Sequence, residues 1–256
     1  MDLIEHLDKR FQYRRFKEDK IPPKELIEKI IRETINLIPV KNEGYNFKLE
    51  IWGPECYEEK RKLAIITIAQ KEYMFGPDNF GVDEDEWYEN AKKLYEYEEN
   101  NNWIPETKDG LVSYFNIQVR APYLISIVLS PEKWNPKEEP VWAQLDSFMA
   151  GMFSYGLSII ANNYGINCAF CSCFEKGLKN HFNFITTPHD TVSVRGGKKS
   201  NCLTLIGLGY YDLLQNQPHS LHANHMHLSQ QLGWKKPFNR SLIKPKPKIE
   251  DIVEWK

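Results

Sequence analysis

The chain has 256 residues, of which 41% are hydrophobic and 27% charged, and its formal net charge is -2. A chain of this length buries roughly three quarters of its unfolded surface, as one large domain or two small ones, and needs no metal or disulfide for stability. The near balance of charges provides no basic surface for nucleic acid or an anionic membrane, so neither partner is expected.

The first ten residues contain three acidic side chains and no apolar core, unlike a secretory signal or a transit peptide. The longest apolar stretch, 141–161, is long enough to span a bilayer, but Gln144, Asp146 and three serines interrupt it. We therefore expect a buried core helix there and no membrane span. The chain has five cysteines, and an odd number is typical of reduced thiols in a cytosol. A soluble, cytoplasmic protein is predicted.

In the first half of the chain, apolar residues recur at helical spacing after Pro22, which predicts a helix over 23–37. Residues 47–52 alternate apolar and polar side chains and predict a half-buried strand. Residues 57–70 are expected to be helical. The acidic and aromatic run 73–115 predicts a solvated, mobile helical excursion that serves as a lid over a substrate.

In the second half, residues 122–129 are almost continuously apolar, as in a central strand of a sheet covered on both faces. A long helix is predicted over 141–164, with Gly165 as its C-terminal cap. Residues 203–208 predict a third strand. This interleaving of helices and strands indicates a layered α+β fold, in which a partner subunit buries some of the helix surface.

Four separated stretches follow one another in a recognisable order. They are the basic segment 9–16 with Pro22 after it, the segment 164–174 after the long helix, the strand end 206–210, and the Lys/Pro run 244–248 that leads into Ile249-Glu250-Asp251-Ile252-Val253. Together they resemble the nitroreductase family of FMN flavoproteins across nearly the whole chain. The resemblance implies one α+β domain over 1–256, with a mixed or antiparallel central sheet flanked by helices and a long buried central helix. It also implies a domain-entwined homodimer, in which the C-terminal extension 233–256 reaches the partner subunit.

The resemblance implies that FMN is bound where the two ends of the chain meet. The residues assigned to the cofactor are Arg10, Phe11, Gln12, Arg14, Asn42, Phe170, Cys171, Ser172, Lys244 and Lys246. The arginines and lysines supply the forked or flexible donors that a phosphate needs. Backbone N–H groups in a turn at 170–172 are expected at the N5 edge of the flavin, where they stabilise its reduced form. No side chain is assigned as a general base, because the cofactor carries the chemistry.

The activity implied is that of an FMN-dependent oxidoreductase, which takes reducing equivalents from NADH or NADPH and passes them to a small aromatic or conjugated acceptor by a ping-pong mechanism. Nitro compounds, quinones and enones are all open as acceptors. Three departures from the family pattern keep an alternative open. Gln12 replaces a serine, the segment 39–46 lacks a glutamine, and Cys171-Ser172-Cys173 crowds the turn. The alternative is a non-catalytic or specialised flavin-fold protein, either a flavin sensor or a protein like the reductive dehalogenases.

A metal-binding protein is the further alternative. His219, His222, His225 and His227 lie within nine residues, and Cys168, Cys171 and Cys173 within six. Imidazoles and thiolates bind zinc and similar ions. However, the cysteine spacing is not that of a paired structural zinc site, and the histidines fall in a polar run. No physiological metal is therefore expected.

Overall fold

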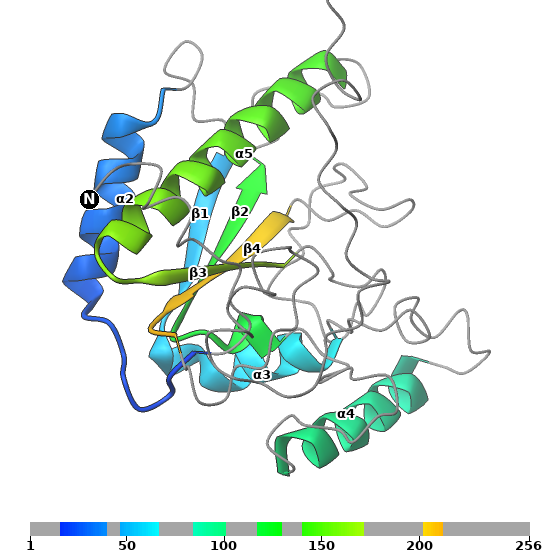
Figure 1. The fold of residues 1–256 in the computed structure, drawn as a ribbon. Coiled ribbons are helices and arrows are strands. Elements are labelled where there is room, and N and C mark those ends of the chain that lie inside the picture. Colours follow the sequence, from blue (N-terminus) through cyan, green and yellow to red (C-terminus); the bar gives the residue numbers. More distant parts are fainter. Residues whose placement is uncertain are drawn as a thin grey trace, which may run out of the picture.

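The computed structural model describes residues 16–39, 47–66, 84–100, 117–129, 140–171 and 202–211. Its strands are β1 (Phe47–Trp52), β2 (Tyr123–Leu129), β3 (Asn167–Cys171) and β4 (Cys202–Gly209). They form one sheet in the order β1-β2-β4-β3, and every neighbouring pair is antiparallel (Figure 1). The helices are α2 (Lys24–Leu37), α3 (Tyr57–Ile66), α4 (Glu84–Asn100) and α5 (Pro140–Asn163), with short 3-10 helices η2 (Pro54–Cys56) and η4 (Ile117–Arg120).

The strand β2 lies in the middle of the sheet, as its continuous apolar sequence predicts. It pairs with β1 over Phe47–Trp52 and with β4 over its own first six residues. The residues from Leu124 to Ile127 are fully buried, because helices cover both faces of the sheet. The register with β4 shifts between Ile127 and Val128, which pairs Val128 with Cys202.

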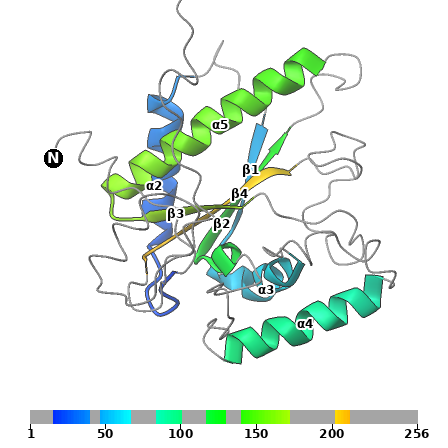
Figure 2. The ribbon, with the colours of Figure 1, turned by 45° about the vertical axis from the view of Figure 1, so that its right-hand side comes forward.

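One face of the sheet is covered by α2 and α5, which lie side by side in both views (Figures 1 and 2). Alternate residues of the strands point to this face and form the main apolar core with Ile27 and Ile30 of α2 and with Phe153 and Leu157 of α5. The rings of Phe47 and Phe153 lie 5.4 Å apart, in a tilted arrangement. The amphipathic period of α2 therefore directs its apolar stripe onto the sheet.

The long helix α5 confirms the predicted helix, and its end confirms the predicted cap. Gly165 adopts a φ of 70°, and the N–H of Ile166 donates to the Ala161 carbonyl at 2.9 Å. The helix is buried on one side only in the single chain, since Phe148 and Tyr155 are exposed on its other side. Within the described residues, no helix has the length and apolar character needed to cross a membrane.

On the opposite face η4 packs against β2, β3 and β4, α3 packs on η4, and α4 packs on α3 farther out (Figure 2). The helix α4 confirms that part of 73–115 is helical. It is not solvated on all sides, because Tyr88, Ala91 and Tyr95 are buried. Whether this segment serves as a lid stays a prediction.

Candidate functional site

Two of the ten residues assigned to a flavin lie in the described part of the chain. Phe170 and Cys171 belong to β3, with Phe170 half-buried and Cys171 buried. The turn predicted at 170–172 is therefore wrong for these two residues, which continue a strand. The others lie outside the described residues and stay predictions: Arg10, Phe11, Gln12, Arg14, Asn42, Ser172, Lys244 and Lys246.

The strand β3 forms because its side chains alternate between two apolar environments. Cys168 and Phe170 face the core under α5, whereas Ala169 packs with Phe16 and Ala121 on the other face. The strand pairs with β4 from Asn167 to Cys171. A short run of cysteine, alanine and phenylalanine carries little strand signal of its own, which is why the sequence pattern did not reveal it.

The N-terminal segment is anchored at the end of β4. Phe16 forms an antiparallel bridge with Tyr211, and the N–H of Lys17 donates to the Tyr210 carbonyl at 2.8 Å. The ammonium group of Lys20 lies 4.2 Å from the centre of the Tyr210 ring. Phe16, the last residue of the basic segment 9–16, and the residue after it are thus fixed against the strand end 206–210.

Two glycines of that strand end are required by close packing. A Cβ atom on Gly207 would lie 2.5 Å from the carbonyl oxygen of Gln118, and one on Gly209 would lie 2.7 Å from Cδ of Pro122 and 2.9 Å from Cδ1 of Phe16. Any larger residue would push the N-terminal anchor and the η4 corner away from the sheet. The glycines therefore let three distant segments meet at the β3–β4 side of the sheet.

Polar contacts complete this edge. The side-chain oxygen of Asn167 accepts the N–H of Tyr211 at 3.0 Å, and the hydroxyl of Thr204 donates to the Cys171 carbonyl at 3.3 Å. Within the described sheet β3 is an outer strand, pairing with β4 on one side. An outer strand presents backbone N–H groups along its far side, which is the kind of donor that the N5 edge of a flavin needs.

Three buried thiols lie on β3 and β4. Cys168, Cys171 and Cys202 are buried and form no disulfide. Burial raises the pKa of the Cys202 thiol to about 12, and its sulfur accepts a hydrogen bond from Ser126 at 3.0 Å. The described residues contain no group of three or more potential metal ligands. Cys173 and the histidines at 219–227 lie outside them.

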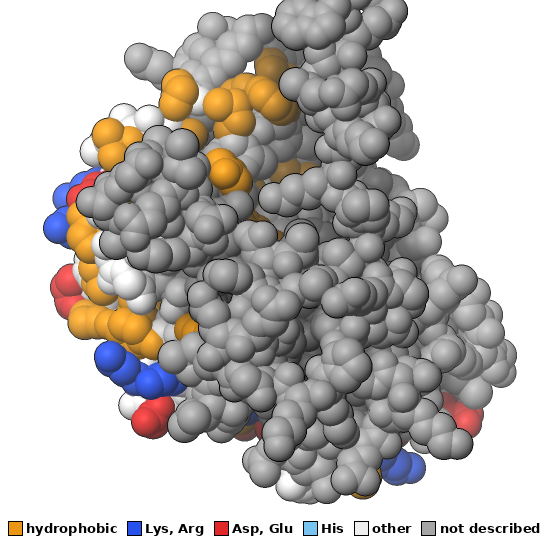
Figure 3. Space-filling model, viewed as in Figure 1, with side chains coloured by type: hydrophobic (Ala, Val, Ile, Leu, Met, Phe, Trp, Pro, Cys, Tyr) orange, Lys and Arg blue, Asp and Glu red, His pale blue; other side chains and the backbone are white. Residues whose placement is uncertain are grey.

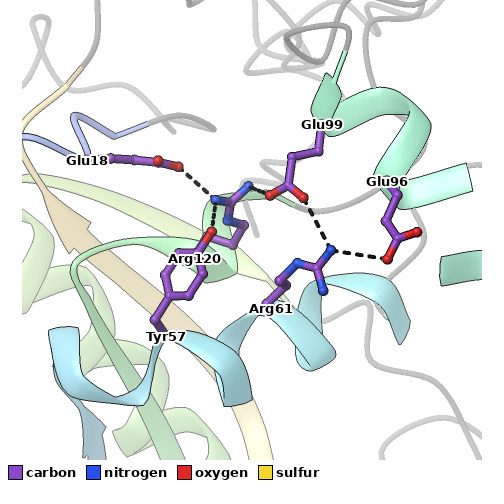
Figure 4. A network of polar contacts seen from close by, with 6 residues as sticks. All are labelled: Glu18, Tyr57, Arg61, Glu96, Glu99 and Arg120. Carbon is purple, nitrogen blue, oxygen red and sulfur yellow. Dashed lines mark hydrogen bonds and ion pairs between the residues drawn. The ribbon is translucent and has the colours of Figure 1, made fainter. Parts of the chain in front are cut away.

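A second polar cluster lies between α3, α4 and η4, and the sequence analysis did not anticipate it (Figure 4). We call it the arginine cluster: Glu18, Tyr57, Arg61, Glu96, Glu99 and Arg120. Arg120 contacts Glu18 at 2.9 Å, Glu99 at 3.0 Å and the Tyr57 hydroxyl at 2.6 Å. Arg61 contacts Glu96 at 3.4 Å and Glu99 at 3.3 Å. These partners are far apart in sequence, so no local spacing could have revealed them.

Lys60, on α3, stabilises the connection between η4 and β2. Its ammonium group donates to the Ala121 carbonyl at 2.9 Å and to the Pro122 carbonyl at 2.8 Å. Burial lowers the pKa of Lys60 to about 8. These two hydrogen bonds hold the short connection from η4 to β2, which packs against Gly207 and Gly209.

Several solved structures share the fold of this chain. A nitroreductase-like family protein from Bacillus cereus aligns over 100% of this chain and 96% of its own, with a TM-score of 0.55 at 12% identity. The FMN and NADPH-dependent nitroreductase NfnB from sphigopyxis sp. strain HMH aligns over 100% and 99%, with a TM-score of 0.54 at 14% identity. The chain has the nitroreductase fold.

A nitroreductase family protein from Streptococcus pneumoniae has the same fold, with full coverage of both chains, a TM-score of 0.50 and 13% identity. No protein-family model and no curated protein sequence matches the chain. The nitroreductase fold thus confirms the resemblance found in the four sequence stretches. Parts of three of those stretches, at 16, 167–171 and 206–210, meet at one side of the sheet.

Proposed function

We propose that the chain binds FMN and uses NADPH or NADH to reduce a small aromatic or conjugated acceptor, such as a nitro compound, quinone or enone. One observation carries this proposal: Phe16, which ends the basic segment, packs against Gly207, Gly209 and Ala169. The last residue of the segment proposed to hold the phosphate therefore packs beside β3, two residues of which are proposed to contact the flavin ring. The similar fold of an FMN and NADPH-dependent nitroreductase supports the same assignment.

The residues fit FMN in their chemistry. Arg10, Arg14, Lys244 and Lys246 are the cations that would hold the phosphate, and Phe11, Gln12 and Asn42 are the other residues proposed to line the cofactor. Of the backbone N–H groups at 170–172, those that point away from β4 would donate to the polar edge of the ring. When bound, FMN supplies hydride transfer, and the chain supplies binding and orientation. Donor and acceptor would use the same site in turn, which predicts ping-pong kinetics.

The helix α5 supports the proposed homodimer. Phe148 and Tyr155 lie seven residues apart, on one side of the helix, and are 62% and 49% exposed in the single chain. Exposed apolar side chains are visible over α2 and α5 (Figure 3). Such a stripe on a long helix is best buried by a second copy of the same chain. We propose a cytoplasmic, entwined homodimer in which residues 1–256 form one domain and 233–256 reach the partner.

Titration of the purified protein with FMN tests the proposal. Arg14 is assigned to the phosphate, whereas its neighbour Arg15 is not, so Arg14→Ala and Arg15→Ala form a matched pair. We expect Arg14→Ala to weaken FMN binding about tenfold or more, because a charge-assisted pair with phosphate is lost, and Arg15→Ala to change it about twofold at most. Equal effects of the two variants would contradict the assignment. Flavin binding without NAD(P)H oxidation would favour a flavin sensor instead.

A further inference from the structure

Arg120 holds three segments of the chain at once. Its Nη2 atom contacts Glu18 of the N-terminal segment and the hydroxyl of Tyr57 at the start of α3. Its Nη1 atom contacts Glu99 in the last turn of α4. Figure 4 shows the guanidinium group between these partners, which approach it from different sides. The two carboxylates therefore use different nitrogen atoms of one planar group.

Of the two carboxylates that contact Arg120, the one on α4 is the more buried. The side chain of Arg120 is 8% exposed and that of Glu99 is 28% exposed, whereas that of Glu18 is 71% exposed. Glu99 also contacts Arg61 of α3, through its second oxygen atom. Tyr57 and Glu99 therefore hold the Arg120 guanidinium in one orientation, whether or not Glu18 contacts it. An arginine whose rotamers are already restricted loses less entropy when it binds a further carboxylate.

Glu18 belongs to the segment that is anchored on β4. Phe16 pairs with Tyr211, and Lys17 donates to the Tyr210 carbonyl. The contact between Glu18 and Arg120 adds a side-chain contact directly after these backbone contacts. The basic segment 9–16 ends in this anchor, at Phe16.

We propose that Arg120 is a positioning residue that couples the docking of α4 to the placement of residues 16–20. By this coupling, α4 stabilises the anchor from which the basic segment departs, and its undocking loosens that anchor. The last link, from the anchor to retention of FMN, rests on the proposed function. The coupling itself is a property of the protein with or without a flavin.

The exposure of Glu18 decides whether the two carboxylate contacts of Arg120 strengthen or weaken each other. Glu18 and Glu99 repel each other as like charges, which would make the two contacts compete. Solvent and salt screen this repulsion, because Glu18 is largely exposed. The fixed orientation of the guanidinium acts in the opposite direction, and the proposal requires that it outweighs the screened repulsion. Removing the charge of Glu99 is therefore expected to weaken the hold on Glu18.

Hydrogen exchange of the full chain tests the coupling, with Glu99→Gln and Glu96→Gln as a matched pair. Both residues lie on α4 and contact Arg61, but in the described structure the contact with Arg120 comes from Glu99. We expect the Lys17 amide to exchange about threefold to tenfold faster in Glu99→Gln and to stay near the wild-type rate in Glu96→Gln, while β2 amides are unchanged in both. Equal rates at Lys17 in the two variants would overturn the coupling.

Arg120→Lys provides an independent test, because it keeps the charge and removes the fork. It should speed exchange at Lys17, and the further change Glu99→Gln should then have little additional effect there. A Lys17 rate that Arg120→Lys leaves unaltered would overturn the proposal.

FMN titration separates the coupling from the proposed function. If wild type binds FMN, Glu99→Gln should weaken binding severalfold and Glu96→Gln should not. Equal FMN affinity in wild type and Glu99→Gln would overturn the link to the basic segment. Failure of the wild type itself to bind FMN would instead count against the proposed function and leave the exchange result intact.

Discussion

The two faces of the sheet are stabilised by different interactions. Under α2 and α5 the contacts are apolar, with Phe47, Phe153 and Leu157 at the centre. Under η4, α3 and α4 the arginine cluster and Lys60 supply hydrogen bonds and ion pairs around a smaller apolar cluster. An apolar face tolerates small shifts, whereas directional contacts fix a chain in place. The polar face is the one that carries the N-terminal anchor.

The largest effect is expected on the apolar face. Phe153→Ala removes a fully buried ring that packs on Phe47 and should lower the free energy of unfolding by about 3–5 kcal/mol. Chemical denaturation measures this loss. Leu37→Ala, at a residue that is 65% exposed, is the control and should change stability by about 0.5 kcal/mol or less. Similar losses in the two variants would contradict the assignment of this core.

A glycine substitution tests how closely η4 packs against β4. Gly207→Ala would place a Cβ atom against the backbone oxygen of Gln118, and should cost about 1–3 kcal/mol of unfolding free energy. Leu37→Ala is again the control, because that side chain is 65% exposed and lies far from this contact in sequence. A neutral Gly207→Ala in the same denaturation assay would show that the corner is loosely packed.

Lys60 makes the polar face sensitive to pH. Its pKa is about 8 in the folded chain, against 10.5 for an ordinary lysine. Between these values the unfolded chain binds more protons, so the wild type should gain stability as the pH rises from about 8 to about 10.5. Relative to Lys60→Met, the gain between pH 7 and 9.5 should be on the order of 2 kcal/mol. Denaturation curves of the two proteins that stay parallel over this range would refute it.

Most helices and strands on both faces were predictable from sequence, including α3 and helical structure at α4, whereas the polar contacts between them were not. Periodicity alone located α2, β1, β2 and α5, because each buries a regular stripe or a continuous apolar run. It missed β3, whose five residues carry no strong strand preference. It also missed the arginine cluster, since Arg120 and Glu18 are 102 residues apart and Arg61 and Glu96 are 35 apart. In the sequence, a charged residue that pairs over such a separation cannot be distinguished from one that is simply exposed to solvent.

The candidate site was predicted in outline by the resemblance and not by periodicity. The structure brings Phe16 and β3 together through Gly207 and Gly209, which explains why small residues are needed in that strand end. The phosphate-binding role of Arg10 and Arg14 depends on the cofactor and stays a prediction. The resemblance to the family assigned a role to those two arginines. The packing of Phe16 against β3 and β4 shows why the chain directly after them is fixed.

The absorption spectrum of the purified protein, recorded before and after NADPH or NADH is added without air, tests the central claim most directly. The proposed function predicts flavin bands, either as purified or after FMN is added, that bleach on reduction and return when a quinone or nitro acceptor is supplied. A colourless protein that takes up no FMN would contradict the claim and direct attention to the histidines at 219–227.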